Sequence, residues 1–215
     1  MAKTAIILGA SGLVGSHLLP MLLDDLSYDK VVAYVRKPLD LKHPKLELRQ
    51  RDLLEDCAFE DARGDDMFCC IGTTQAKTPD LTEYRKIDFG IPVNAARAAL
   101  KLGMERCMVI SSMGANANSR TFYLRIKGQM EEALKKMSIP ELHILRPSLL
   151  LGEREEFRSG ERLFAFLMKF FRWFIPNRYR AIEAEQVARA MMNLKGQLYS
   201  EVVVESDEIR SLASE

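Results

Sequence analysis

The chain has 215 residues, 47% of them hydrophobic, and its 31 lysines and arginines nearly balance 30 aspartates and glutamates to give a net charge of +1. Nucleic-acid-binding proteins usually carry a basic excess, so we expect no nucleic-acid partner. No apolar stretch reaches membrane-spanning length without charges, and the first strand begins too early for a signal peptide to precede it. We therefore expect a cytoplasmic protein that forms one domain over residues 1–215.

The first predicted element is a strand, which a glycine-rich turn and a helix follow directly. An apolar run over residues 5–8 is too short for a helix and is typical of a buried strand. The glycines after it have the spacing G-x-x-G-x-x-G, and leucines then recur at helical intervals. Strand, turn and helix in this order open a dinucleotide-binding unit, in which the helix amides face the phosphates. The residues expected at the phosphates are Gly9, Ser11, Gly12, Leu13, Val14 and Gly15.

Strand and helix patterns alternate through the middle of the chain. Apolar runs predict further strands over residues 30–35, 46–48, 67–71, 107–110 and 142–145, and helical patterns predict helices over about 13–23, 55–62, 81–102 and 122–137. Pro92 should break or kink the helix over residues 81–102, and Gly103 should end it. The alternation predicts an α/β fold, a Rossmann doubly wound parallel sheet with helices on both faces. Residues 1–150 would form its dinucleotide-binding core.

Residues 151–215 should form a small cap region over the strand ends, integral to the same domain. A helix is predicted over residues 184–194 and a strand over 202–204. Residues 163–175 are dense in aromatics, and so large an apolar patch should cover the substrate cleft or be buried in a homodimer. The alternative is a helix lying on a membrane surface, which Lys169, Arg172 and Trp173 would suit.

The chain has four cysteines, Cys57, Cys69, Cys70 and Cys107. They form no C-x-x-C pair and have no metal-ligand spacing, so we expect buried free thiols and no metal site. The three histidines are interpreted as structural, and the pairs Glu131–Glu132 and Glu155–Glu156 as solvated surface.

Tyr123 and Lys127 are four residues apart in a predicted helix, so their side chains share one face. A cation beside a phenol favours its ionised form. Tyr123 could then give a proton to a carbonyl oxygen or remove one from an alcohol. Ser111 and Ser112 end the strand before this helix, and a serine hydroxyl there could hold the substrate oxygen against the tyrosine.

Four motifs, GASGLVG, ISSMGA, Y-x-x-x-K and LRPSLLLG, resemble in this order the atypical or extended branch of the short-chain dehydrogenase/reductase superfamily. The stretches FCCIGTTQAKT and FYLRIKGQMEEALK are similar to the Tat-interacting-protein-like oxidoreductases. The resemblance implies that Ser112 orients the substrate, Tyr123 is the acid/base, and Lys127 holds the nicotinamide ribose. Ser111 could exchange roles with Ser112, although the loop that follows favours Ser112.

The resemblance also implies cofactor contacts on neighbouring strand ends. Gly72 and Thr73 would lie along the cofactor. Asp52 and Leu53 would lie by the adenine, and Pro147 near the nicotinamide. Many relatives carry an asparagine in the helix after the fourth strand, where this chain has Asp88. The family's proton relay through that asparagine is therefore not implied here.

The expected cofactor is NADP(H) rather than NAD(H). NAD-binding proteins usually place an acidic residue after the second strand to bind the ribose 2′-hydroxyl. This chain has Arg36 and Lys37 there, whose charges suit a 2′-phosphate.

These observations favour an NADP-dependent oxidoreductase that moves a hydride to or from the carbon of a small carbonyl or alcohol substrate. The alternative is an NADPH-binding regulator that acts through a protein partner without significant turnover. The presence of Ser112, Tyr123 and Lys127 together favours the enzyme.

Overall fold

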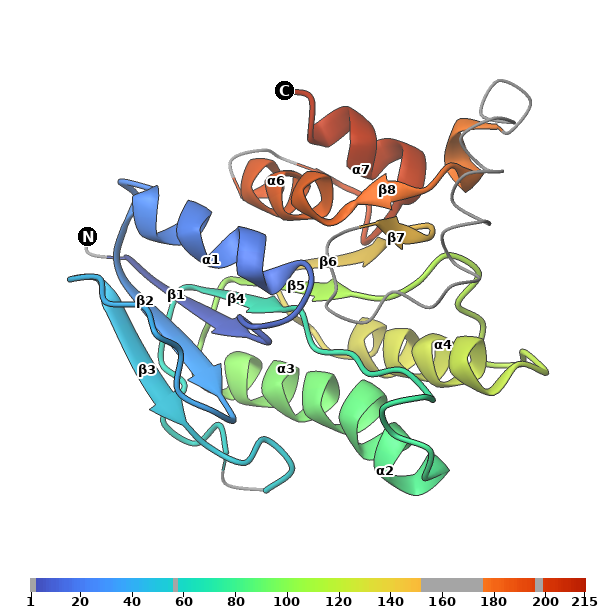
Figure 1. Cartoon of the computed structure of the whole chain (residues 1–215), viewed down its shortest axis with the longest axis horizontal. Coiled ribbons are helices and arrows are strands. Elements are labelled where there is room, and N and C mark those ends of the chain that lie inside the picture. Colours follow the sequence, from blue (N-terminus) through green and yellow to red (C-terminus); the bar gives the residue numbers. More distant parts are fainter. Residues whose placement is uncertain (1–2, 56–57, 152–175, 196–198) are drawn as a thin grey trace.

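The computed structural model describes residues 3–55, 58–151, 176–195 and 199–215. Its middle layer is a seven-stranded parallel sheet in the order β3-β2-β1-β4-β5-β6-β9 (Figure 1). The strands are β1 Lys3–Leu8, β2 Tyr28–Val35, β3 Leu46–Gln50, β4 Asp66–Cys69, β5 Arg106–Ile110, β6 Glu141–Arg146 and β9 Val203–Glu205. The chain runs outward from β1 to β3 and then returns to β4 on the other side of β1, so the strand order reverses between β1 and β4.

Helices cover both faces of the sheet (Figure 1). On one face lie α1 (Gly15–Asp24), α6 (Ala184–Leu194) and α7 (Ser206–Leu212), and on the other lie α3 (Ile91–Lys101) and α4 (Phe122–Lys135). Successive residues of β1 enter two different cores, because side chains alternate along a strand. Ala5 and Ile7 belong to the core of α1 and α6, whereas Ile6 and Leu8 belong to that of α3 and α4. The predicted doubly wound fold is confirmed, and the continuous apolar run of β1 follows from burial on both faces.

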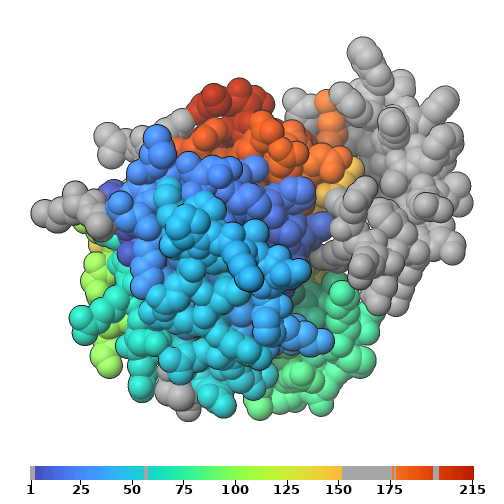
Figure 2. Space-filling model, turned by 60° about the vertical axis from the view of Figure 1, so that its left-hand side comes forward, coloured from blue at the N-terminus to red at the C-terminus, as the bar shows by residue number. Residues whose placement is uncertain are grey.

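The described part of residues 176–215 builds onto the same sheet. β9 pairs with β6, and α6 packs against α1, so that the blue and orange segments lie side by side in Figure 2. Glu183 and Gln186 form a capping box that starts α6. A second, two-stranded sheet consists of β7 (Leu150–Leu151) and β8 (Ile182–Glu183). The short helix η2 (Asn177–Tyr179) comes just before β8 in the chain.

The predicted helix over residues 81–102 consists of three parts. These are α2 (Leu81–Arg85), the π-helical segment η1 (Lys86–Gly90), and α3. Pro92 has no N–H to donate to the carbonyl four residues earlier, and its ring would clash with that carbonyl. The helix widens instead, and the Ile91 N–H donates to the Lys86 carbonyl, five residues back. The irregularity predicted at Pro92 therefore takes the form of a π-helical turn, and the chain stays helical through it rather than breaking. Gly103 ends the helix at φ +76°, as predicted.

Some predicted elements differ from the structure. The described residues between 55 and 62 form turns rather than a helix. The second sheet and α7 have no counterpart among the predicted elements, because each is too short to give a clear hydrophobic period. The aromatic stretch at residues 163–175 lies outside the described residues. None of the described helices is long and apolar enough to span a membrane.

Candidate cofactor and catalytic site

The turn between β1 and α1 requires glycine at two positions. Gly9 has φ +81°, which favours glycine over residues with a side chain. A Cβ on Gly15 would lie 2.1 Å from the carbonyl oxygen of Gly9, so no side chain fits there. Within the turn, the Gly12 N–H donates to the Gly9 carbonyl at 2.9 Å. This close approach of helix to strand is the one that the glycine spacing predicts.

The start of α1 fits a phosphate group. Its N-cap residue, Val14, makes no side-chain hydrogen bond to the first turn, and that turn contains no acidic residue. The first amides of a helix need an acceptor and carry a partial positive charge. Ser11 is exposed at the mouth of the turn, beside the half-buried Gly12 and Leu13. The residues present therefore suit the pyrophosphate of a dinucleotide.

Two cations follow β2 at the same edge of the sheet. Arg36 and Lys37 are exposed, and no ion pair is formed by either of them within the described residues. The Arg36 carbonyl accepts from the side chain of Gln50, which ends the neighbouring β3. Just after β3, Leu53 is buried and Asp52 is exposed, with its carboxylate accepting the Leu54 N–H at 3.0 Å. These placements are compatible with the predicted 2′-phosphate and adenine contacts.

A buried ion pair lies beside the loop after β4. The Lys127 ammonium is 3.0 Å from Oδ1 of Asp88, and both residues are buried, with 3% and 0% exposure. The other oxygen of Asp88 accepts the Thr73 N–H at 2.8 Å. Gly72 is exposed, and a Cβ there would lie 3.6 Å from Asp88 Oδ1 and 3.8 Å from Lys127 Nζ. The structure thus places Gly72 and Thr73, which are expected along the cofactor, next to Lys127, which is expected at its ribose, and adds Asp88.

The pKa of Lys127 is raised by this arrangement. Burial disfavours the charged ammonium, but the charges of Asp88 and Tyr123 and the contact with the Asp88 carboxylate outweigh it. Tyr123 lies in the first turn of α4, half-buried, and close enough to act on Lys127 through its charge. The predicted neighbourhood of Tyr123 and Lys127 is therefore present.

The two serines at the end of β5 differ in their surroundings. Ser111 is buried, and its hydroxyl donates to Glu131 at 2.5 Å. Ser112 is half-buried, and its hydroxyl makes only a long contact of 3.4 Å with the Met113 carbonyl. The Met113 N–H in turn donates to the carbonyl of Pro147, which is itself buried. Of the two hydroxyls, that of Ser112 is the one left available for a substrate oxygen.

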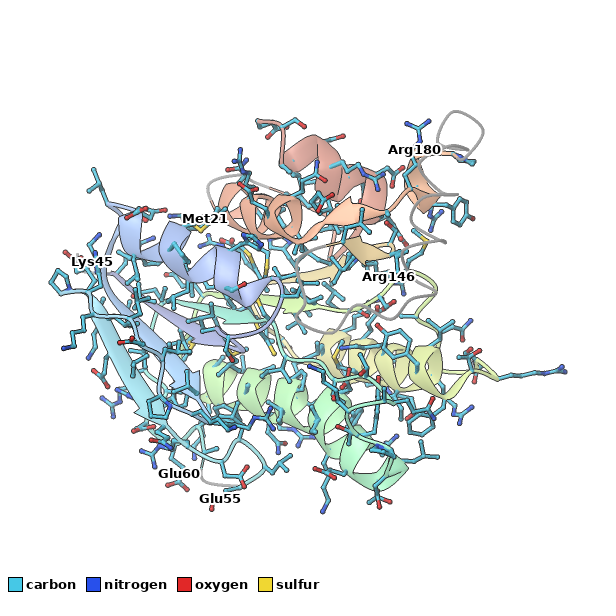
Figure 3. The ribbon with its side chains drawn as sticks, in the orientation of Figure 1. Met21, Lys45, Glu55, Glu60, Arg146 and Arg180 are labelled. Atoms are coloured by element: carbon cyan, nitrogen blue, oxygen red, sulfur yellow. The ribbon has the colours of Figure 1, made fainter. Side chains whose placement is uncertain are left out.

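Glu131 is a residue whose interpretation from sequence was wrong. It was expected on the solvated surface, but it is 2% exposed and accepts from two nitrogens of Arg146, at 2.9 and 2.5 Å. Arg146, labelled in Figure 3, also donates to the Ala115 carbonyl at 3.2 Å and to Glu205 at 3.1 Å. The network fixes α4 to β6 and to the segment after β5. The only sign of this buried role in the sequence is a glutamate one helical turn after Lys127, and such a glutamate cannot be distinguished from one on the surface.

Gly128 is a second position that the sequence reading missed. A Cβ there would lie 2.2 Å from the backbone of both Asn116 and Ala117, so the loop before α4 crosses the helix at this glycine. The available signal was a glycine inside a helical pattern. Glycine lowers helix stability, so its presence there suggests that another segment packs too closely for a side chain.

Metal and disulfide chemistry find little support in the described residues. Among them there is no group of three or more histidine, cysteine or acidic side chains that could hold a metal ion. Cys69, Cys70 and Cys107 are free thiols; the first and third are buried, Cys70 is partly so, and Cys57 lies outside the described residues. Burial raises the pKa of the Cys69 thiol to about 11, which disfavours its reactive thiolate.

The chain belongs to the NAD(P)H-binding family, whose model matches residues 9–194. With its strand order and motifs, this makes it an atypical member of the short-chain dehydrogenase/reductase superfamily and confirms the predicted family resemblance.

Yeast proteins are among its relatives. Protein FMP52-1, mitochondrial, of Scheffersomyces stipitis is 36% identical over 156 residues, which cover 71% of this chain and 69% of the yeast protein. Protein FMP52, mitochondrial, of Meyerozyma guilliermondii is 31% identical over 223 residues, 98% of this chain and 95% of that protein. These names overturn the cytoplasmic location predicted from the sequence. The prediction rested on the lack of a membrane-spanning stretch and of room for a signal peptide, and neither feature distinguishes the cytoplasm from a mitochondrion.

Solved structures of similar fold are epimerases and related proteins. The ADP-L-glycero-D-manno-heptose-6-epimerase of Helicobacter pylori superposes with a TM-score of 0.71 at 19% identity, over 99% of this chain and 81% of that one. MoeE5 in complex with UDP-glucose and NAD gives a TM-score of 0.65 at 18% identity, over 98% and 81% of the two chains. At such low identity the likeness shows the fold alone.

Proposed function

We propose that the protein is an NADP-dependent oxidoreductase that moves a hydride to or from the carbon of a carbonyl or alcohol group. The observation that supports the proposal is the position of Lys127, whose ammonium lies 3.4 Å from the carbonyl of Ile110, the last residue of β5. Ser112 follows two residues after Ile110, and Tyr123 lies one helical turn before Lys127 in α4. Cofactor binding alone would require the turn and a ribose contact, but not a serine and a tyrosine beside them.

Each side chain has a distinct role in this reaction. Bound NADPH would supply the hydride to the carbonyl carbon. Ser112 would hold the carbonyl oxygen, and Tyr123 would give its hydroxyl proton to that oxygen as it gains the electron pair of the C=O bond. Lys127 would hold the ribose and stabilise the phenolate by its charge. In the opposite direction Tyr123 would take the alcohol proton, and the hydride would return to NADP⁺.

A second candidate function is an NADPH-binding regulator that acts through a protein partner. The Asp88–Lys127 ion pair favours it, because a lysine already paired with a carboxylate acts less strongly on a neighbouring phenol. The trio of serine, tyrosine and lysine favours the enzyme.

Tyr123→Phe separates the two functions, since it removes one hydroxyl and keeps the ring. We expect turnover of a panel of aldehydes, ketones and quinones with NADPH to fall by about two to four orders of magnitude. NADPH affinity should barely change, because the glycine turn and helix amides hold the phosphates. Tyr199→Phe is the matched control, since this ring packs against His143, away from the carboxyl ends of the strands. Wild-type turnover no higher than that of Tyr123→Phe, with tight NADPH binding by both, would leave the regulator as the function.

The cofactor preference is tested at Arg36. Arg36→Ala should weaken NADPH binding by about tenfold or more, the loss of a charge-assisted hydrogen bond, and leave NADH binding nearly unchanged. Arg63→Ala removes an exposed arginine that lies just before β4, and should affect neither. If the wild-type protein binds NADH as tightly as NADPH or more tightly in calorimetric titrations, or if Arg36→Ala does not change NADPH binding, the preference is refuted.

A further inference from the structure

Asp88 is a buried charged residue to which the proposed function assigns no role in binding the cofactor or the substrate. It lies in the π-helical segment η1 and is fully buried, and its two oxygens face Lys127 on α4 and Thr73 on the loop after β4. A π-helical turn inside a helix is rare and is frequent at functional sites. Here the turn and Pro92 set the position of one carboxylate between two elements of the candidate site.

The contact between Asp88 and Lys127 is a buried ion pair. Oδ1 of Asp88 lies 3.0 Å from the Lys127 ammonium and has no other polar partner within the described part of the chain. Lys127 makes a further contact of 3.4 Å with the Ile110 carbonyl. A buried ammonium with so few acceptors needs a nearby negative charge to keep its proton.

The exposed Gly72 leaves this ammonium reachable. A side chain there would stand within 4 Å of both charges, so glycine keeps them accessible from the carboxyl edge of the sheet. A polar group entering beside Gly72, such as a ribose hydroxyl, could donate to Oδ1 of Asp88 and accept from Lys127, because a carboxylate oxygen has more than one lone pair.

We propose that Asp88 is a positioning residue, the counter-ion that keeps Lys127 protonated and holds its ammonium beside Gly72 and Thr73, where the cofactor ribose would meet it. This role rests on the proposed function for what Lys127 binds, but not for the ion pair itself. An asparagine in the same place could accept the Thr73 N–H, but it could not supply the charge.

The charge predicts a pH dependence of defined sign. The groups that face Lys127 are Asp88 from η1, Tyr123 from α4 and Cys69 from β4. Because the pKa of Lys127 is raised in the folded protein, its contribution to stability is complete below the unfolded value of about 10.4 and is lost only as the pH rises through the folded value. In Asp88→Asn, burial would lower the pKa of the unpaired ammonium below its unfolded value. That variant should be least stable relative to wild type at neutral pH and should approach it as the pH rises.

The test measures urea unfolding of the cofactor-free wild-type, Asp88→Asn and Asp24→Asn proteins at pH 7, 8.5 and 9.5. Asp24 is exposed at the end of α1 and controls for loss of one negative charge. The thiols of the unfolded chain titrate in this range in all three proteins, so the midpoint differences between proteins are compared. We expect the deficit of Asp88→Asn to shrink by about half or more between pH 7 and 9.5, and that of Asp24→Asn to stay constant. A deficit of Asp88→Asn that is the same at every pH would overturn the proposal.

NADPH titration supplies the second readout. Binding to wild type should be nearly constant over this pH range, whereas binding to Asp88→Asn should weaken with rising pH, by up to about tenfold per pH unit once Lys127 loses its proton. A pH-dependent stability deficit with no NADPH binding by any variant would keep the ion-pair role and reject the proposed function. Normal turnover of the wild-type protein, together with a stability deficit of Asp88→Asn that is constant with pH, would keep the proposed function and reject the ion-pair role.

If Asp88→Asn does not fold, a double variant with Lys127→Met replaces it. Removing both charges leaves no buried ion, so the double variant should fold and be more stable than either single change. A double variant that is no more stable than the worse single variant would overturn the proposal.

Discussion

At the amino edge of the sheet, the first residues of four parallel strands join in one chain of hydrogen bonds. Tyr28 donates to Asp66 at 2.5 Å, and Arg106 donates to Asp66 at 2.7 Å and to Glu141 at 2.6 Å. Burial and the bond to Asp66 raise the pKa of Tyr28, so its hydroxyl keeps its proton. Each of these charges is satisfied by its neighbours across the strands.

At the carboxyl edge, some polar groups have fewer partners. Oδ1 of Asp88 contacts only the Lys127 ammonium in the described part of the chain, and the hydroxyl of Ser112 has only a long contact. Glycines at positions 9, 15 and 72 bring backbone close or leave side chains reachable. The difference teaches that a closed polar cluster ties strands together, whereas an open one retains bonding capacity for a ligand.

The largest expected effect on NADPH binding comes from Gly15→Ala. Its Cβ would lie 2.1 Å from the Gly9 carbonyl oxygen, so the turn must open and NADPH binding should fall by about a hundredfold or more. Gly90→Ala is the matched change, because nothing lies within 4 Å of its Cβ. That variant should keep its NADPH affinity and gain up to about 1 kcal/mol in stability. Equal cofactor affinities of the two variants would contradict a phosphate site at the turn.

A smaller effect should separate the two serines. Ser112→Ala should lower turnover by about tenfold or more with little change in stability, since its hydroxyl is free for substrate. Ser111→Ala should cost about 1 kcal/mol of stability through the lost bond to Glu131, with a lesser effect on turnover. Urea unfolding and steady-state kinetics measure both. A greater loss of turnover in Ser111→Ala would reverse the assignment.

Much of the fold was predictable because local signals and burial agree. The apolar run of β1, the glycine spacing after it and the irregular helix before Pro92 each have one physical explanation. Short elements such as β7 and α7 carry too few residues for a hydrophobic period.

Side-chain pairings in the candidate site were predictable only where the two residues lie close in sequence. Tyr123 and Lys127 meet because a helix brings residues four apart together. The partners Asp88 and Lys127, or Glu131 and Arg146, come from different elements, and no local pattern distinguishes their charges from solvated ones. Strand order and helix packing decide which of them meet.

The most direct measurement compares NADPH affinity after Lys127→Met and after Arg106→Met. Both remove a buried cation paired with a buried aspartate, at opposite edges of the sheet. Both should lower the free energy of unfolding by about 3 kcal/mol. Measured under conditions where both variants are folded, NADPH affinity should fall by about tenfold or more in Lys127→Met and stay within about twofold of wild type in Arg106→Met. Equal losses in the two variants, or a loss confined to Arg106→Met, would contradict a cofactor site at the carboxyl edge.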